Sequence, residues 1–199
     1  MKFDSKVFFQ MLFRPAANFM ARAGITANQV TASTILLSLA AGTAVCLWPE
    51  HRWPLITILS VMFVRLAFNH IDGMLAREHG METPLGGILN ELSDVISDIA
   101  LFLPLAAISG IAPWPVFLAV LFGVITEMSG VVGLTIGASR REDGPLSKKP
   151  RGVFFAIIIL AIILGETPGG WMNVLLIALL PLMVLTIINR VKGAIREVA

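Results

Sequence analysis

Six long apolar segments, separated by short polar connections, follow a mixed segment at the start of this chain. A helix needs roughly 20 apolar residues to cross a bilayer, and all but the somewhat short fifth segment are close to that length. Several of the segments begin or end at Trp or Pro, which is typical of the membrane interface. We therefore predict an all-α polytopic membrane protein whose residues 27–189 form a bundle of six transmembrane helices. The predicted spans are residues 27–48, 53–75, 86–109, 114–138, 152–164 and 171–189.

Residues 3–22 interleave aromatic and aliphatic side chains with basic ones and are too polar to span a membrane. This composition is typical of an amphipathic helix that lies in the headgroup plane. A plain charged leader is the alternative, and the clustered Phe8, Phe9, Phe13 and Phe19 favour the interfacial helix. The segment lacks an uninterrupted apolar core followed by an Ala-x-Ala exit, so we expect no cleavable signal peptide.

Composition agrees with the hydropathy pattern. The mean hydropathy is +0.84 and 56% of the 199 residues are apolar, which is outside the range of soluble globular proteins. We expect one integral-membrane domain over residues 1–199. Cys46 is the single cysteine, so the chain forms no intramolecular disulfide. Bilayer lipid is the expected environment, and we expect no nucleic-acid partner.

The distribution of Lys and Arg predicts the orientation. With six spans, thirteen of these residues fall in the N-terminal region, the second and fourth connections and the tail, whereas Arg52 is alone on the opposite side. Basic residues concentrate in cytoplasmic connections. We therefore expect a multi-pass protein of the cell (inner) membrane with both termini in the cytoplasm.

Polar side chains interrupt the second and third spans and form two stripes. Asn69 and Asp72 lie three residues apart, and Asn90 and Asp94 lie four apart, so each pair shares one face of a helix. Gly80 and Pro84 lie between the two stripes, and they favour a helical hairpin whose stripes face each other. Carboxylate and amide oxygens suit the hard cations Mg²⁺, Mn²⁺ and Ca²⁺, and a hard cation in turn implies a substrate that carries phosphate.

The spacing of this stretch resembles the signature of the CDP-alcohol phosphatidyltransferases. That signature is an acid, two residues, Asp-Gly, two residues, Ala-Arg, eight residues, Gly, three residues, an acid, three residues and Asp. Asp72-Gly73, Ala76-Arg77, Gly86 and Asp94 match it, whereas Asn69 and Asn90 stand at the first and third acidic positions. The resemblance thus indicates a variant member of this family.

The resemblance implies transfer of a substituted phosphate group from a CDP-linked lipid, most simply CDP-diacylglycerol, to an alcohol acceptor, with release of CMP. It assigns Asn69, Asp72, Asn90 and Asp94 to one or two ions of Mg²⁺ or Mn²⁺, and Asp94 also to the general base. It also implies a homodimer. The implied contacts to CDP or its diphosphate are Asn28, Thr31, Asp72, Gly73, Ala76, Arg77 and Gly86.

The two asparagines reduce the formal charge of the four signature positions from −4 to −2, because an amide oxygen is neutral. Three alternatives follow. Glu91 or Asp98 is recruited as an additional ligand, the phosphates of the donor complete the charge, or the protein holds one ion or none and is inactive in this reaction. Retention of Arg77, Asp94 and both glycines favours an active site.

The connection 139–151 holds five cations beside the predicted mouth of the site. One interpretation is topological, with these cations contacting anionic headgroups. The other is a pocket for the phosphate of a phosphorylated acceptor, with Arg140, Lys148 and Arg151 as candidates, because residues 148 and 151 share a helix face that turns toward the third span. Within the bundle, the buried Arg65 needs a partner, for which Glu127 is one candidate, and we expect a structural ion pair there.

Two other functions fit parts of the sequence. Intramembrane carboxylates could support cation- or proton-coupled transport, but we find no inverted repeat, and transport leaves the signature spacing unexplained. A catalytically impaired protein that binds a CDP-lipid without turning it over would keep the same residues. Formation of CMP distinguishes these functions from the transferase.

Overall fold

The computed structural model describes the backbone of residues 5–199 and the side chains from residue 9 onward. Over this part of the chain the fold is all-helical, as predicted, with seven α-helices and two short 3-10 helices. Residues 3 and 4 of the predicted interfacial helix lie outside the described residues. The elements are α1 (Ser5–Arg22), α2 (Ala27–Leu47), α3 (Trp53–Glu78), α4 (Pro84–Phe102), η1 (Leu103–Ala107), α5 (Pro113–Val132), η2 (Gly133–Ile136), α6 (Lys148–Leu164) and α7 (Gly170–Val198).

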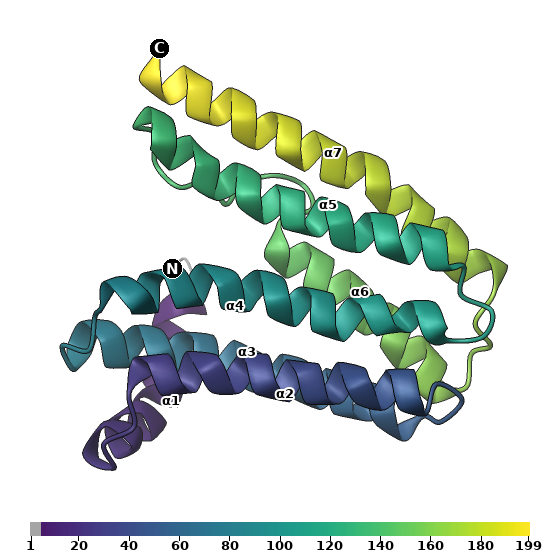
Figure 1. Cartoon of the computed structure of the whole chain (residues 1–199), viewed down its shortest axis with the longest axis horizontal. Coiled ribbons are helices and arrows are strands. Elements are labelled where there is room, and N and C mark those ends of the chain that lie inside the picture. The colour runs from purple at the N-terminus through teal and green to yellow at the C-terminus, as the bar shows by residue number, and fades with distance from the viewer. Residues whose placement is uncertain (1–4) are drawn as a thin grey trace.

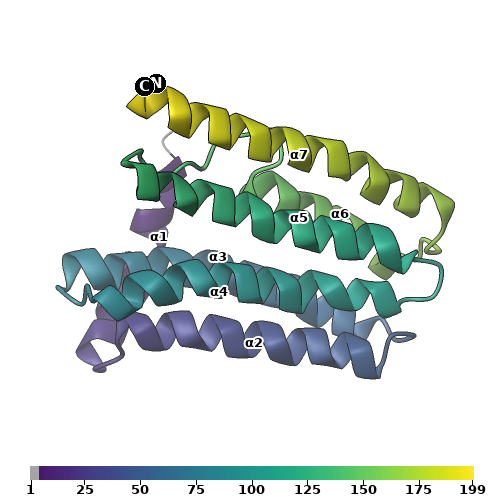
Figure 2. The same cartoon turned by 45° about the horizontal axis from the view of Figure 1, so that its top comes forward.

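The helices form two groups that lie one above the other in Figure 1. The lower group contains α1 to α4, in which α2 packs against both α3 and α4, and α1 crosses the end of α3. The upper group pairs α5 with α7, and α6 joins the groups by packing on α3. Figure 2 shows the long helices running roughly side by side, as expected for a membrane bundle.

Four helices of the described chain are long and apolar enough to cross a membrane: α2, α3, α5 with η2, and α7. The remaining two predicted spans are α4, which carries Glu91, Asp94 and Asp98, and α6, which has 17 residues. At about 1.5 Å per residue, α6 falls short of a bilayer core of about 30 Å unless neighbouring segments assist it. The count of six spans therefore stays a prediction, whereas a multi-pass membrane protein is supported.

Several helix ends differ from the predicted spans. The third span ends as an α-helix at Phe102, because Pro104 removes a backbone donor and the chain continues as the 3-10 helix η1. The fourth span likewise tightens into η2 after Val132. In contrast, α6 begins four residues before the predicted start, and α7 extends beyond Asn189 to Val198. The apolar pattern locates a span, but it does not detect the polar helical turns that extend the helix beyond the span.

Gly42 of α2 lies directly against the backbone of α4. A Cβ added at this residue would lie 1.9 Å from the backbone carbonyl oxygen of Ala100. Small residues permit such close backbone approach in membrane bundles. The contact fixes α4, which carries Asn90 and Asp94, against α2.

We therefore expect Gly42→Ala to lower the free energy of unfolding by about 1–3 kcal/mol, since the methyl group cannot fit without moving a backbone. Gly87→Ala is the control, because a Cβ there has no neighbour within 4 Å. Thermal unfolding of the detergent-solubilised variants measures both effects. Equal stability of Gly42→Ala and the wild-type protein would contradict this packing.

Candidate active site

A cleft of about 570 Å³ opens where α2 begins, α3 ends and α4 begins. It contains all seven residues that the signature implies for CDP or its diphosphate, together with Asn69 and Asn90. The predicted hairpin is confirmed, because α3 ends at Glu78 and α4 begins at Pro84, which brings the two polar stripes to one cleft. The lining is Ala27, Asn28, Thr31, Asn69, Asp72, Gly73, Ala76, Arg77, Met81, Glu82, Thr83, Pro84, Gly86, Gly87 and Asn90.

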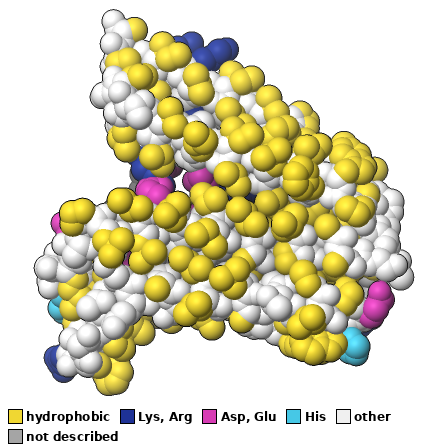
Figure 3. All heavy atoms as spheres, in the orientation of Figure 1, with side chains coloured by type: hydrophobic (Ala, Val, Ile, Leu, Met, Phe, Trp, Pro, Cys, Tyr) yellow, Lys and Arg dark blue, Asp and Glu magenta, His cyan; other side chains and the backbone are white. Residues whose placement is uncertain are grey.

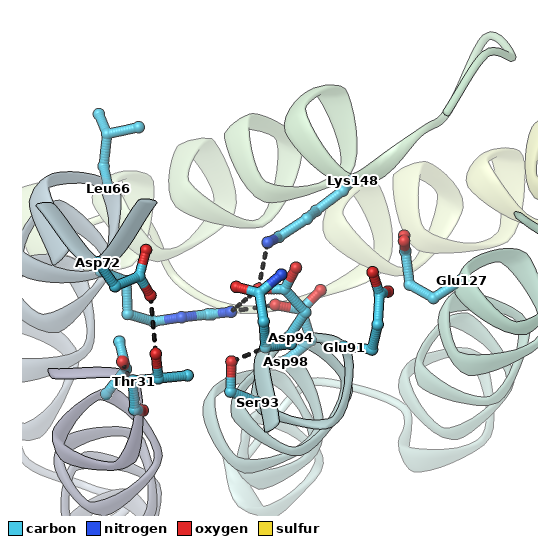
Figure 4. A network of polar contacts seen from close by, with 12 residues as sticks. Thr31, Leu66, Asp72, Glu91, Ser93, Asp94, Asp98, Glu127 and Lys148 are labelled. Atoms are coloured by element: carbon cyan, nitrogen blue, oxygen red, sulfur yellow. Dashed lines mark hydrogen bonds and ion pairs between the residues drawn. The ribbon is translucent and has the colours of Figure 1, made fainter. Parts of the chain in front are cut away.

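Asp72 is the carboxylate of the signature that faces this cleft. It is 6% exposed, and the Thr31 hydroxyl donates a hydrogen bond of 2.9 Å to its Oδ2. Figure 4 shows these two side chains pointing toward each other from α3 and α2. Asp72 makes no ion pair among the described residues and has a neutral hydrogen-bond partner, which suits an oxygen ligand for a cation.

Both signature glycines make room for side chains of the site itself. A Cβ at Gly73 would lie 2.7 Å from Nη2 of Arg77, so the guanidinium folds back over this residue. A Cβ at Gly86 would lie 2.6 Å from Oδ1 of Asn28. The amide of Asn28 also donates to the Thr83 hydroxyl at 3.2 Å, and that hydroxyl accepts from the Gly86 amide at 2.9 Å. The start of α2 is thereby joined to the start of α4.

Helix α2 begins with a capped first turn. Thr26 accepts a hydrogen bond from the backbone of Gln29, and the Gln29 side chain accepts from the Thr26 amide. This capping box satisfies two donors at the helix start. Asn28 is consequently free of a capping role and points toward Thr83.

Asp94 lies beside the cleft rather than in its lining. The ammonium group of Lys148 makes an ion pair with it, and the Arg65 guanidinium is 3.9 Å away. In Figure 4, Lys148 reaches down from the start of α6 toward Asp94 and Asp98 on α4. Figure 3 shows an open notch between the two helix groups with acidic and basic side chains at its floor.

A chain of alternating charges runs through the middle of the bundle and joins five helices. Arg65 on α3 pairs with Asp98 on α4 at 3.0 Å, and Asp98 pairs with Arg151 on α6 at 2.7 Å. Arg151 continues to Glu127 on α5 at 3.2 Å, and Glu127 lies 3.9 Å from Arg190 on α7. Arg151 and Arg190 are 2% and 1% exposed. Arg65 thus makes a structural ion pair, but the candidate partner Glu127 was wrong, because Asp98 lies against Arg65 and Glu127 pairs with Arg151.

These pairs also limit the residues proposed to replace the missing acids. Glu91 is held by Arg140 at 2.8 Å, and Asp98 lies between two arginines. Charges that are already compensated attract a metal ion less than the free carboxylate of Asp72 does. Asp98 thus joins α4 to α3 and α6, and Glu91 joins α4 to the 139–147 connection.

The three candidate phosphate ligands face α4 and α5, as the helix spacing predicted for Lys148 and Arg151. Each has a carboxylate partner: Arg140 pairs with Glu91 and Glu142, Lys148 with Asp94, and Arg151 with Asp98 and Glu127. The side chains of Arg140 and Lys148 keep 33% and 30% exposure, whereas that of Arg151 keeps 2%. Arg140 and Lys148 are exposed enough to contact an incoming anion, whereas Arg151 is buried in its ion pairs inside the bundle.

Within the described residues, no cluster of three or more His, Cys, Asp or Glu side chains is arranged to hold a metal ion. The donors that fit a hard cation are instead mixed, with Asp72 and the amide oxygens of Asn69 and Asn90 lining one cleft. This set supplies oxygen ligands and one negative charge. It fits a weakly held ion completed by the phosphates of a bound nucleotide.

Sequence reasoning missed two residues that shape the site. Arg190 was counted only as a positive charge of the tail, yet it donates to the backbone carbonyls of Thr126 at 2.5 Å and Asp143 at 3.0 Å, which ties the 139–147 connection to α7. Thr83 was assigned no role, yet it links Asn28 to Gly86. A threonine directly before Pro84 is a helix-cap signal that could have identified it.

Comparison with known proteins establishes the class. The family model described as CDP-alcohol phosphatidyltransferase matches residues 24–188. This chain belongs to that family, and the prediction of a transferase for substituted phosphate groups is confirmed. The transport alternative has no support from this match.

Particular relatives refine the comparison. Over 195 residues the chain is 35% identical to the inner membrane protein YnbA of Escherichia coli K12, covering 97% of this chain and 96% of that protein. It is 28% identical over 169 residues to phosphatidylinositol phosphate synthase of Mycobacterium marinum, covering 80% of this chain and 67% of the synthase. Both matches extend well beyond the signature.

The fold is shared with a solved structure. Phosphatidylinositol phosphate synthase of Mycobacterium tuberculosis with CDP-DAG bound has a TM-score of 0.76 at 21% identity, covering 92% of this chain and 94% of the synthase. The same synthase in complex with manganese and citrate has a TM-score of 0.71 at 22% identity, covering 92% and 88%. These similarities show that the helical architecture is common to both proteins.

Proposed function

We propose that this protein transfers a phosphatidyl group from CDP-diacylglycerol to a small alcohol and releases CMP, as a step of phospholipid synthesis. The observation that carries the proposal is the cleft in which Asn28, Thr31, Asp72, Gly73, Ala76, Arg77 and Gly86 come together. The starts of two helices and the Arg77 guanidinium in this cleft are suited to a nucleotide diphosphate, and the Asp72 carboxylate is suited to the cation that accompanies it. The solved relative with CDP-DAG bound supports the choice of donor.

Phosphoryl transfer is accelerated mainly by positioning and by neutralising charge on phosphate oxygens. In the proposed reaction, the acceptor hydroxyl attacks the phosphorus that carries the lipid, and its proton passes to a carboxylate oxygen of Asp94. The bond from that phosphorus to the bridging oxygen breaks, and CMP leaves with the electron pair. Arg77 would hold the diphosphate through its planar fork of donors. Asp94 fits the base, because it lies one helical turn beyond Asn90, which lines the cleft, and its carboxylate is directed toward Lys148 at the start of α6 (Figure 4).

A divalent cation, Mg²⁺ or Mn²⁺, held by Asp72 with Asn69 and Asn90 would neutralise the diphosphate when bound. The manganese complex of the solved relative supports this cofactor. Asp94 is the fourth signature position, and its ion pair with Lys148 distinguishes it from the other three.

The acceptor is proposed to enter through the notch between the helix groups. If it carries a phosphate, Arg140 and Lys148 are the exposed cations that would bind it, whereas Arg151 would orient Asp98 and Glu127. Preference for an unphosphorylated alcohol would contradict this phosphate pocket without affecting the donor site.

We also propose that the cleft opens to the cytoplasm and that both termini lie on that side. The thirteen Lys and Arg residues assigned to that side support this orientation. In Figure 1, α1, the α3–α4 connection and the end of α7 lie at the same end of the molecule.

Resemblance to the family supports a homodimer, which the mass of the detergent-solubilised protein would test.

The test uses purified protein in detergent with CDP-diacylglycerol, Mg²⁺ or Mn²⁺, and matched pairs of free and phosphorylated alcohols. Chromatography measures CMP, and mass spectrometry identifies the lipid product. CMP and a new phospholipid formed in equal amounts would support the transferase. Nucleotide binding without CMP would instead indicate a CDP-lipid-binding protein, and neither binding nor turnover would contradict the proposal.

A further inference from the structure

The two signature carboxylates of this site have different electrostatic surroundings. Asp72 accepts a hydrogen bond from the neutral Thr31 and lines the open cleft. Asp94 has cations on two sides, with Lys148 in direct contact and Arg65 at 3.9 Å. The remaining signature positions are the neutral Asn69 and Asn90. One half of the site is therefore ready for a divalent cation, and the other half already holds positive charge.

We infer that the ammonium group of Lys148 takes the place of one divalent cation, so that the cleft of this protein binds a single ion on the Asp72 side. This inference rests on the proposed function, because it concerns the ions that accompany the nucleotide in the same cleft. Beyond the proposed function, it sets the number of bound ions at one and assigns Lys148 to the place of a second ion.

Charge balance supports a single ion. One divalent cation and Arg77 carry positive charge that equals the charge of Asp72 together with the doubly negative diphosphate bridge of a CDP-lipid. Asp94 does not enter this balance, because Lys148 compensates it. A second divalent cation would leave the site with excess positive charge and would have to lie near the Lys148 ammonium and the Arg65 guanidinium. Unit charges at such short range repel strongly in a partly buried site.

The amide residues fit the same arrangement. Asn69 and Asn90 can donate carbonyl oxygens to an ion without adding negative charge. Acids at these positions would offer enough charge for a second ion and would also compete with Asp94 for Lys148. The two amides and the lysine beside Asp94 therefore both favour the binding of a single ion.

The number of bound ions is measured by titrating the purified protein with Mn²⁺ in the presence of saturating CDP and following free Mn²⁺ by electron paramagnetic resonance. Equilibrium dialysis with labelled CDP confirms nucleotide binding in the same samples. The wild-type protein is expected to bind one Mn²⁺ per chain. The Asn69→Asp/Asn90→Asp variant together with Lys148→Gln is expected to bind two.

The contribution of Lys148 follows from comparison of variants. In the background with both aspartates, Lys148→Gln should tighten the second Mn²⁺ by about tenfold or more, since it removes a nearby like charge. Lys149→Gln is the matched control, because Lys149 is exposed at the same helix start and has no ion-pair partner among the described residues. It should leave both affinities unchanged.

Each outcome decides the inference. One ion in the wild-type protein and two in the triple variant, with no effect of Lys149→Gln, supports it. Two ions with bound CDP in the wild-type protein would overturn it while leaving the proposed function intact. An equal effect of both lysine substitutions would overturn the role of Lys148. Binding of neither CDP nor Mn²⁺ would contradict the proposed function as well.

Discussion

Substitution of Asp94 by Asn is expected to lower the rate of CMP release by about 10²–10⁴-fold, the range that general-base catalysis contributes. An amide has nearly the shape of a carboxylate, but it cannot take the proton of the acceptor hydroxyl. The change leaves the cleft lining intact, because Asp94 is not part of it. Affinity for CDP should therefore change much less than the rate. Release of CMP from CDP-diacylglycerol, measured at saturating acceptor, gives the comparison.

Asp143→Asn provides the control for this experiment. It makes the same chemical change at an exposed carboxylate of the 139–147 connection, whose ion pair among the described residues is with Arg141 at 3.2 Å. Its rate should stay within a factor of about two of the wild-type rate. If Asp94→Asn released CMP at that same rate, the assignment of Asp94 as the base would be wrong.

Substitution of Arg151 by Met should produce the largest loss of stability. The arginine is 2% exposed and pairs with Asp98 at 2.7 Å and Glu127 at 3.2 Å. The substitution removes the closest cation of both acids and leaves Asp98 with Arg65 alone and Glu127 with Arg190 at 3.9 Å. Breaking a buried ion pair typically costs about 3–5 kcal/mol. We therefore expect the free energy of unfolding in detergent to fall by about this amount, measured through the intrinsic fluorescence of the four Trp residues.

Arg196→Met tests whether the loss reflects this particular position. Arg196 is exposed near the end of α7 and has no ion-pair partner among the described residues, so the same substitution should change stability by less than about 0.5 kcal/mol. Similar stability of the two variants would show that the chain of charges from Arg65 to Arg190 does not hold the bundle together.

The sequence was sufficient to predict the cleft because its information is local. Asn69 and Asp72 are separated by one helical turn, as are Asn90 and Asp94, and a breaker between the pairs forces a hairpin. This geometry follows from spacing alone, and the structure accordingly brings three of these four residues to one cleft. The predicted nucleotide contacts came from the family resemblance, which supplies the distant Asn28 and Thr31.

The ion pairs could not be predicted because they depend on how helices distant in sequence are rotated against each other. Arg65 has several intramembrane carboxylates as conceivable partners, and hydropathy does not distinguish Asp98 from Glu127. The choice is made by the packing of α6, which brings Arg151 between those two acids. The same limit applies to Lys148, whose contact with Asp94 depends on α6 beginning four residues earlier than its apolar pattern.

The central claim is that the cleft between α2, α3 and α4 holds a CDP-lipid and its cation. Crystals of the protein with CDP-diacylglycerol and Mn²⁺, measured for the anomalous signal of manganese, test it most directly. We expect the cytidine diphosphate next to Gly73 and Arg77 and one manganese peak beside Asp72. Nucleotide and manganese found elsewhere in the molecule, with this cleft empty, would contradict the account.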